Sequence, residues 1–163
     1  MKIATTMEYD ATPQEVFAVL SDKAFQEAKC AATAAVKYTA EVSSTADVTT
    51  IRTERVLPAD ALPDFAKNMV GQTLKVLETQ TWGPAATDGS RTGKVEMSVA
   101  GVPVSLAGTL SLAPGASGTV ETLDSELKAK VPLIGGKIEK AAAPPIQEAI
   151  AIEAATAKQW LRR

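Results

Sequence analysis

Apolar and polar residues alternate one by one along most of the first 131 positions of the chain. Alternation of this kind is typical of half-buried β-strands, because successive side chains point to opposite faces of a sheet. The breaks between the alternating stretches are mostly short and carry turn residues, which predicts hairpins and an antiparallel sheet. The predicted strands are seven in number and span residues 2–9, 35–42, 48–57, 73–82, 94–99, 104–112 and 119–131, the last being the longest.

Three short helices are predicted between these strands. Thr12, Pro13 and Glu15 form a capping box with proline in the first turn, which begins a helix directly after the first strand. Ser21 is a candidate cap for a second short helix with Phe25 and Ala28 on its apolar side. Residues 62–70 predict a third, ended by Gly71.

The last part of the chain changes from a period of two to a helical period. At about 100° per residue, one face of the helix after Pro145 is apolar and the opposite face is polar. Glu153 lies close to the centre of the apolar face. Pro144 and Pro145 donate no backbone hydrogen bond, so we expect a kinked helix or two helices in tandem. The apolar face comprises Ile146, Ala149, Ile150, Ala157, Trp160 and Leu161.

Together these elements predict an α+β protein. The length of 163 residues favours a single domain over residues 1–163. The apolar face of the sheet must be covered, and the final helix is the only predicted element long enough to cover it. We therefore expect a seven-stranded antiparallel sheet wrapped around a long C-terminal helix, with two short helices after the first strand.

Composition excludes several classes of function. A net charge of −2 without a basic cluster argues against nucleic acid as a partner. No apolar run reaches the roughly 18 residues of a membrane span, so no stable membrane insertion is expected. The chain has no histidine and one cysteine, Cys30, which excludes Ser-His-Asp and Cys-His catalysis and leaves no metal site or cofactor to predict. Cys30 is interpreted as a structural thiol of a cytoplasmic protein.

The interior is short of bulky side chains, because aromatic residues make up only 4% of the chain and the final helical run is rich in alanine. Such an interior either packs tightly or encloses a cavity. Glu153 would then anchor a polar group of a ligand, or pair with a residue such as Arg55. The residues predicted to line the cavity are Val36, Tyr38, Ile51, Arg55, Val95, Met97, Leu106, Leu110, Leu123 and Leu127 from the sheet, and Ile146, Ala149, Ile150, Glu153 and Ala157 from the helix.

Two stretches carry a family resemblance. Residues 9–17, YDATPQEVF, and residues 127–139, LKAKVPLIGGKIE, resemble the first strand-to-helix entry and the last strand-to-helix exit of the START-like superfamily, also called SRPBCC. The chain more closely resembles an uncharacterised, largely actinobacterial branch of it, a domain of unknown function. The resemblance implies the helix-grip fold and a cavity for an apolar ligand. Members bind lipids, sterols, polyketides or plant hormones, and some are cyclases or aromatases.

Three functions follow from these observations. The first is binding or carrying of a hydrophobic small molecule without catalysis, the function we expect. The second is a polyketide cyclase- or aromatase-like enzyme that uses a buried carboxylate, with Glu153, Arg55, Tyr38 and Glu78 as candidates. The third is an interaction module whose interior is filled by its own side chains. The sequence leaves the oligomeric state open.

Overall fold

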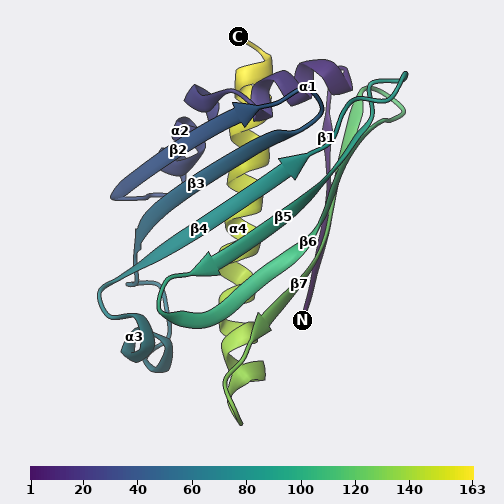
Figure 1. Ribbon diagram of the computed structural model, residues 1–163. Helices are drawn as coiled ribbons and strands as arrows, with labels where there is room; N and C mark the ends of the chain where they lie inside the picture. The colour runs from purple at the N-terminus through teal and green to yellow at the C-terminus, as the bar shows by residue number, and fades with distance from the viewer.

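A computed structural model describes all 163 residues. One sheet and one layer of helices make up the fold, with the long helix α4 along the inner face of the curved sheet (Figure 1). The elements are β1 (Lys2–Tyr9), α1 (Pro13–Leu20), α2 (Lys23–Ala32), β2 (Lys37–Ser44), β3 (Thr49–Pro58), α3 (Asp64–Val70), β4 (Thr73–Trp82), β5 (Arg91–Val99), β6 (Val102–Pro114), β7 (Thr119–Ala129) and α4 (Gly135–Leu161).

The sheet is fully antiparallel and has seven strands in the order β1-β7-β6-β5-β4-β3-β2. The predicted α+β helix-grip fold is therefore confirmed. The last strand is shorter than predicted and ends at Ala129, while β6 is the longest with 13 residues. The reason is that the register of β7 with β6 ends at Ala129, opposite Val104, so the strand pairing does not continue to Val131.

The helices after β1 follow the sequence signals with one correction. The capping box is present, since the backbone N–H of Glu15 donates to Thr12 Oγ1 at 3.2 Å and the N–H of Thr12 donates to Glu15 Oε2 at 3.0 Å. Ser21 does not cap α2. It still belongs to the last turn of α1, where its hydroxyl donates to the Phe17 carbonyl at 2.7 Å. Asp22 caps α2 instead, accepting from the Ala24 N–H at 2.9 Å.

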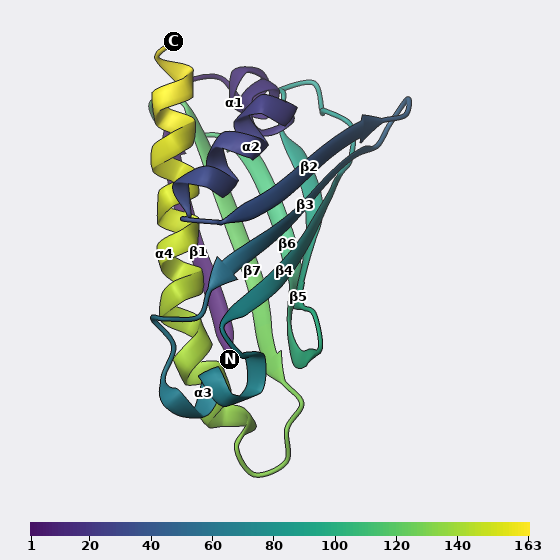
Figure 2. The ribbon, with the colours of Figure 1, turned by 90° about the vertical axis from the view of Figure 1, so that its left-hand side faces the viewer.

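Helix α4 is one continuous helix of 27 residues, so the alternative of two helices in tandem is wrong. Pro144 and Pro145 lie inside it and are exposed. The carbonyls of Lys140 and Ala141, which lose their usual partners, therefore lie on the solvent side, where water can bond to them. Along its length α4 packs against α1 and α2, and against β7 and β1 of the sheet (Figure 2).

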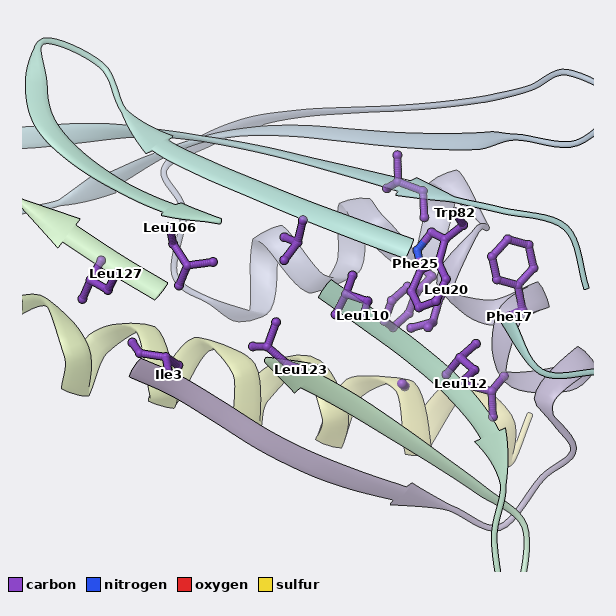
Figure 3. Close-up of a cluster of buried hydrophobic side chains, with 14 of the residues drawn as sticks. Ile3, Phe17, Leu20, Phe25, Trp82, Leu106, Leu110, Leu112, Leu123 and Leu127 are labelled. Atoms are coloured by element: carbon purple, nitrogen blue, oxygen red, sulfur yellow. The ribbon is translucent and has the colours of Figure 1, made fainter. Parts of the chain in front are cut away.

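Aromatic side chains fill one end of the interior. Phe17 meets Trp82 edge to face at 5.8 Å between ring centroids, and Phe25 meets Trp160 in the same way at 5.7 Å. Figure 3 shows Phe17, Phe25 and Trp82 gathered at this end, beside α1 and α2, while the aliphatic residues Ile3, Leu106 and Leu127 continue the apolar face toward the other end. None of the helices is both long and apolar enough to cross a membrane.

Candidate functional site: a buried ion cluster between the sheet and the helices

Four charged side chains meet in the interior, between β3, β4, α2 and α4. Lys29 of α2 is only 1% exposed, and its Nζ lies 3.4 Å from Glu78 Oε1 and 3.4 Å from Glu153 Oε2. Arg55 Nη2 lies 3.6 Å from the other oxygen of Glu78. We call these four residues the ion cluster. Its two positive and two negative charges balance, which is the condition under which charges tolerate burial.

The periodicity of each element places these side chains inward. Glu78 lies opposite Thr53 in the β3–β4 register, and Arg55 follows Thr53 by two residues on the same face. Lys29 comes one helical turn after the buried Phe25 and so lies on the apolar face of α2. The cluster therefore depends on four separate elements, the neighbouring strands β3 and β4 and the helices α2 and α4.

Hydrogen bonds fix the geometry of the cluster. Gln80 Nε2 donates to Glu78 Oε1 at 2.8 Å, and Trp82 Nε1 donates to Gln80 Oε1 at 3.0 Å. On the other side, Arg55 Nη1 donates to Thr33 Oγ1 at 3.1 Å. The chain from Trp82 to Glu78 links the aromatic core to the ion cluster, so the carboxylate is held in place by side chains that are themselves packed.

The pKa values of the cluster follow from its charges. Burial alone would raise the pKa of Glu78, but the charges of Lys29 and Arg55 outweigh it and lower this pKa to about 2. Burial alone would lower the pKa of Lys29, and the carboxylates of Glu153 and Glu78 raise it above the ordinary lysine value. Lys29 and Glu78 are therefore both charged at neutral pH.

A second buried carboxyl group lies nearby on β7. Glu121 is 3% exposed, and the hydroxyl of Tyr9 donates to its Oε2 at 3.0 Å. Burial, followed by the charge of Glu153, raises the pKa of Glu121 to about 8. The pKa of Tyr9 is raised as well, first by burial and then by the charge of Glu121. At neutral pH Glu121 is mostly protonated, in contrast to Glu78.

Two polar atoms beside Glu78 have no partner in the protein. They are Thr53 Oγ1 and Arg55 Nε, on side chains whose residues are 4% and 5% exposed. Gln26 Oε1 is a third such atom, on α2. A buried polar atom without a partner is costly. The hydroxyl of Thr53 and the Nε–H of Arg55 are therefore buried groups whose hydrogen-bonding capacity the chain itself leaves unused.

The predicted lining residues divide into three groups. Arg55 and Glu153 are brought together in the ion cluster through Lys29 and Glu78. Glu153 pairs with Lys29 and not with Arg55. Half-buried residues of β5 and α4 form the second group: Met97, Ile146, Ala149 and Ile150. Fully buried residues form the third: Ile51, Val95, Leu106, Leu110, Leu123, Leu127 and Ala157.

Val36 and Tyr38 depart from the predicted arrangement. Val36 is 69% exposed and precedes β2, and Tyr38 is 38% exposed. Tyr38 does lie opposite Arg55, on the inner-facing side of β2. However, β2 is the edge strand, so Tyr38 has a neighbouring strand on one side only. Of the four residues proposed for an enzyme, Glu153, Arg55 and Glu78 belong to the ion cluster, and Tyr38 takes part in none of its ion pairs.

Two of the hollows on the surface contain no predicted lining residue. One, of about 320 Å³, lies at the free edge of β2, lined by Lys23, Ala40, Glu41, Val42, Ser43, Thr50 and Arg52. The other, of about 420 Å³, lies beside the start of α1, lined by Asp10, Ala11, Thr12, Pro13, Gln14, Glu15, Asp88, Pro114, Ser117 and Gly118. The cavity between sheet and helix remains a prediction.

Sequence reasoning missed Lys29, Glu121 and the roles of Gln80 and Tyr9. The signals were present for two of them. Glu121 has the same parity as Leu123 and Leu127 on β7 and therefore had to point inward. Lys29 follows Phe25 at helical spacing. A charged residue at an apolar position of its own pattern is thus the signal that identifies this site.

The remaining candidates for chemistry are metal-binding side chains and the thiol of Cys30. No group of three or more histidine, cysteine, aspartate or glutamate residues is arranged to hold a metal ion. Cys30 is buried, and burial raises the pKa of its thiol. A buried thiol of high pKa is a poor nucleophile, in keeping with its interpretation as a structural residue.

Comparison with known proteins assigns the family. Residues 4–161 match the family described as "Protein of unknown function (DUF2505)", and the chain belongs to this family. It is also similar to the uncharacterized protein Rv0481c of Mycobacterium tuberculosis (strain ATCC 25618 / H37Rv), with 30% identity over 102 residues. That match spans 61% of this chain and 58% of the relative's length.

Solved structures share the fold at low sequence identity. The STAR-related lipid transfer protein from Xanthomonas axonopodis (fragment 25–204) matches with a TM-score of 0.63 and 15% identity, covering 99% of this chain and 86% of that chain. Ara h 8.0201 matches with a TM-score of 0.59 and 11% identity, covering 99% of this chain and 97% of that chain. The START-like helix-grip fold predicted from residues 9–17 and 127–139 is confirmed.

Proposed function

We propose that the protein binds and carries a hydrophobic small molecule between the inner face of the sheet and α4, without converting it chemically. The class of ligand is a lipid-, sterol- or polyketide-like molecule. The fold is shared with a protein described as a lipid transfer protein, which supports a ligand-binding role. The internal charges support binding over catalysis, because the ion cluster is balanced and its members are already paired.

One observation carries the proposal. Apolar side chains of α3, β5 and α4 that pack against the core are only half-buried. They are Phe65, Met69, Met97, Ala142, Ile146 and Ile150. Ala149 is also half-buried and lies outside the core cluster. Protein interiors are normally close-packed, so inward-facing apolar surface that the chain leaves uncovered is suited to an apolar ligand.

The ion cluster supplies the polar end of this site. Thr53 Oγ1 and Arg55 Nε are buried without a partner, and both lie beside Glu78. A hydroxyl or carbonyl oxygen on the ligand would accept from Arg55 Nε and bond to the Thr53 hydroxyl. The site therefore favours a mostly apolar molecule that carries an oxygen at one end, since few well-placed polar groups fix orientation in such sites.

Replacing Ala149 with Phe tests whether the space is open. If it is, the phenyl ring occupies the ligand's position, so binding of the apolar fluorescent probe N-phenylnaphthylamine is lost while the melting temperature is kept. In a tightly packed interior the same change costs about 1–3 kcal/mol through overpacking. Ala151→Phe on the exposed side of α4 is the matched control and should leave both measurements unchanged. If the wild type binds no probe and Ala149→Phe destabilises the protein, the interior is instead filled by its own side chains.

Replacing Thr53 with Val tests the polar end. The change removes a hydroxyl that has no partner in the protein, so the free energy of unfolding should stay the same or rise. Binding of anthracenemethanol should weaken by about fivefold, corresponding to the loss of one hydrogen bond, while binding of anthracene itself should not change. Equal effects on the two probes would contradict the placement of the ligand oxygen.

Native mass spectrometry of the protein from its own host would identify the natural ligand.

A further inference from the structure

The turn between β7 and α4 carries exposed aliphatic side chains at one end of the molecule. Leu133 is 105% exposed and Ile134 is 41% exposed, and Pro132 beside them is exposed as well. Both ribbon views show this turn projecting beyond the sheet, at the end opposite the C-terminus and next to α3 (Figures 1 and 2). We call residues 131–134 the apolar tip.

The backbone at Leu133 shows that folding alone does not favour leucine there. Its φ is 70°, in the left-handed region where a β-carbon is crowded and where glycine or asparagine is usual. The side chain gains no burial in return, since it is fully exposed. The fold therefore gives no reason for a leucine at this position.

Lysines flank the apolar tip along the chain, two around the end of β7 and two in the first turns of α4. Lys128, Lys130, Lys137 and Lys140 are all exposed, whereas the whole chain has a net charge of −2. Glu139 is the only acidic residue between positions 128 and 140. Its carboxylate is already used within the protein, accepting from the Ala129 N–H at 3.0 Å and lying 3.3 Å from the amino group of Met1. This end of an acidic protein thus presents four lysines to solvent.

The same end borders the proposed ligand site. Lys137 Nζ lies 4.3 Å from the centre of the Phe65 ring, which ties the beginning of α4 to α3. Phe65 and Met69 of α3 belong to the half-buried apolar residues that border the interior. A surface that contacts the apolar tip would therefore lie beside these residues.

We propose that the apolar tip and the lysines around it dock reversibly on a membrane surface that contains anionic lipids. Leu133 and Ile134 would enter the boundary between head groups and acyl chains, and the lysines would lie against the lipid phosphates. An apolar tip with a basic rim matches that surface in both polarity and charge. This is peripheral contact, without a membrane span, and it is a property beyond the proposed ligand binding.

Co-sedimentation of the full chain with vesicles tests the proposal. Binding is expected to vesicles of phosphatidylcholine mixed with phosphatidylglycerol, and to be much weaker with phosphatidylcholine alone or at high salt. The decisive variant is Leu133→Asn, because asparagine tolerates a positive φ. It should bind the anionic vesicles at least about tenfold more weakly, since the leucine side chain that would be buried in the membrane is lost. Its melting temperature should stay the same or rise.

Matched variants separate this surface from general effects. Val36→Asn removes another exposed aliphatic residue and should leave vesicle binding unchanged. Lys130→Gln should weaken it by about fivefold, and Lys94→Gln, an equal charge change on the outer face of β5, should have little effect. The proposal would be overturned if the wild-type protein did not bind anionic vesicles, or if the Leu133→Asn variant bound them as well as the wild type does. Ala149→Phe should bind vesicles normally, so failure of the ligand site is distinguishable from failure of this one.

Discussion

Lys29 illustrates how one residue constrains the interior of this protein. Its side chain is 2% exposed, and it has two carboxylates, Glu78 and Glu153, each at 3.4 Å. Removing one partner from a buried ion pair leaves the other charge without compensation, which costs more than the pair itself contributes. Lys29 therefore holds α2, β4 and α4 in one arrangement, because each of the three elements supplies one of the charges.

Replacing Lys29 with Met tests this role. The variant leaves Glu78 with Arg55 as its only cationic partner and leaves Glu153 without its partner, so we expect a loss of about 3–5 kcal/mol in the free energy of unfolding measured with urea. Lys75→Met is the control, because Lys75 pairs with Glu54 at 2.9 Å on the surface, where both side chains are more than 40% exposed. That pair should contribute about 0–1 kcal/mol. Similar losses in the two variants would contradict the role of Lys29.

Glu121 adds a pH dependence of the opposite sign to that of Glu78. Its pKa is about 8 in the folded protein, against the ordinary glutamate value of 4.5 that applies to the unfolded chain. The folded state therefore keeps the proton to higher pH than the unfolded state does. Its contribution to stability is complete below about pH 4.5 and is lost as the pH rises toward about 8. Glu78, with a pKa of about 2, contributes above pH 4.5 and loses that contribution as the pH falls below it.

Replacing Glu121 with Gln should remove the loss of folding stability at alkaline pH. The variant keeps the shape of the side chain and cannot ionise, so its stability relative to the wild type should rise between about pH 5 and pH 9. Urea unfolding at several pH values measures this difference, which isolates Glu121 from the other groups that titrate. Glu96→Gln, at an exposed position on β5, should give a difference that does not change over this range. A constant difference for Glu121→Gln would show that its carboxyl is charged throughout.

At the scale of elements, α4 shows how packing overrides local signals. The Pro144-Pro145 pair predicts an interruption, because each proline removes a hydrogen bond and disfavours helix for the residue before it. The helix nevertheless continues from Gly135 to Leu161, with Ile138 and Ala143 buried before or beside the prolines and Ala154 and Ala157 buried after them. Both halves are thus held by contacts with the rest of the protein, and the prolines face solvent, where their cost is lowest.

The edge strand β2 shows the opposite case, in which a correct local pattern does not lead to burial. Alternation assigned Tyr38, Ala40 and Val42 to one face, and the structure keeps them on it. Only Ala40 is fully buried, whereas Tyr38 is 38% exposed. A strand at the end of the order has one neighbour, so its residues are covered only where a helix reaches them.

At the scale of the whole molecule, the two ends of the interior differ. One end is closed by α1 and α2, with Phe17, Phe25 and Trp82 filling it (Figure 3). The other end is bordered by α3 and the beginning of α4, where apolar residues such as Phe65 and Ile146 stay half-buried. The apolar tip projects at that same end. The proposed ligand site and the proposed membrane contact therefore adjoin each other, as transfer of an apolar molecule to or from a membrane requires.

The sequence by itself determined the elements, the facing of nearly all strands and the fold. The reason is that these properties depend on local periodicity and on the need to cover one apolar face. Alternation offered Thr49, Ile51, Thr53 and Arg55 as one possible inward face of β3 without deciding it, and all four are buried. The apolar face of α4 was predicted for the same reason, as was the position of Glu153 within it.

Only the tertiary structure decided which charges meet. Glu153 could have paired with any cation above the sheet, and its partner proved to be Lys29, because α2 packs against both α4 and the strands β2 and β3. Alternation alone does not decide the facing of β4, for a related reason. Its inner face carries Glu78 and Gln80 among apolar residues, a pattern that contradicts hydrophobic alternation. The pattern is explained only by the ion pairs of Glu78 with Lys29 of α2 and Arg55 of β3. Long-range charge pairing has no period along the chain, so the sequence could not reveal it.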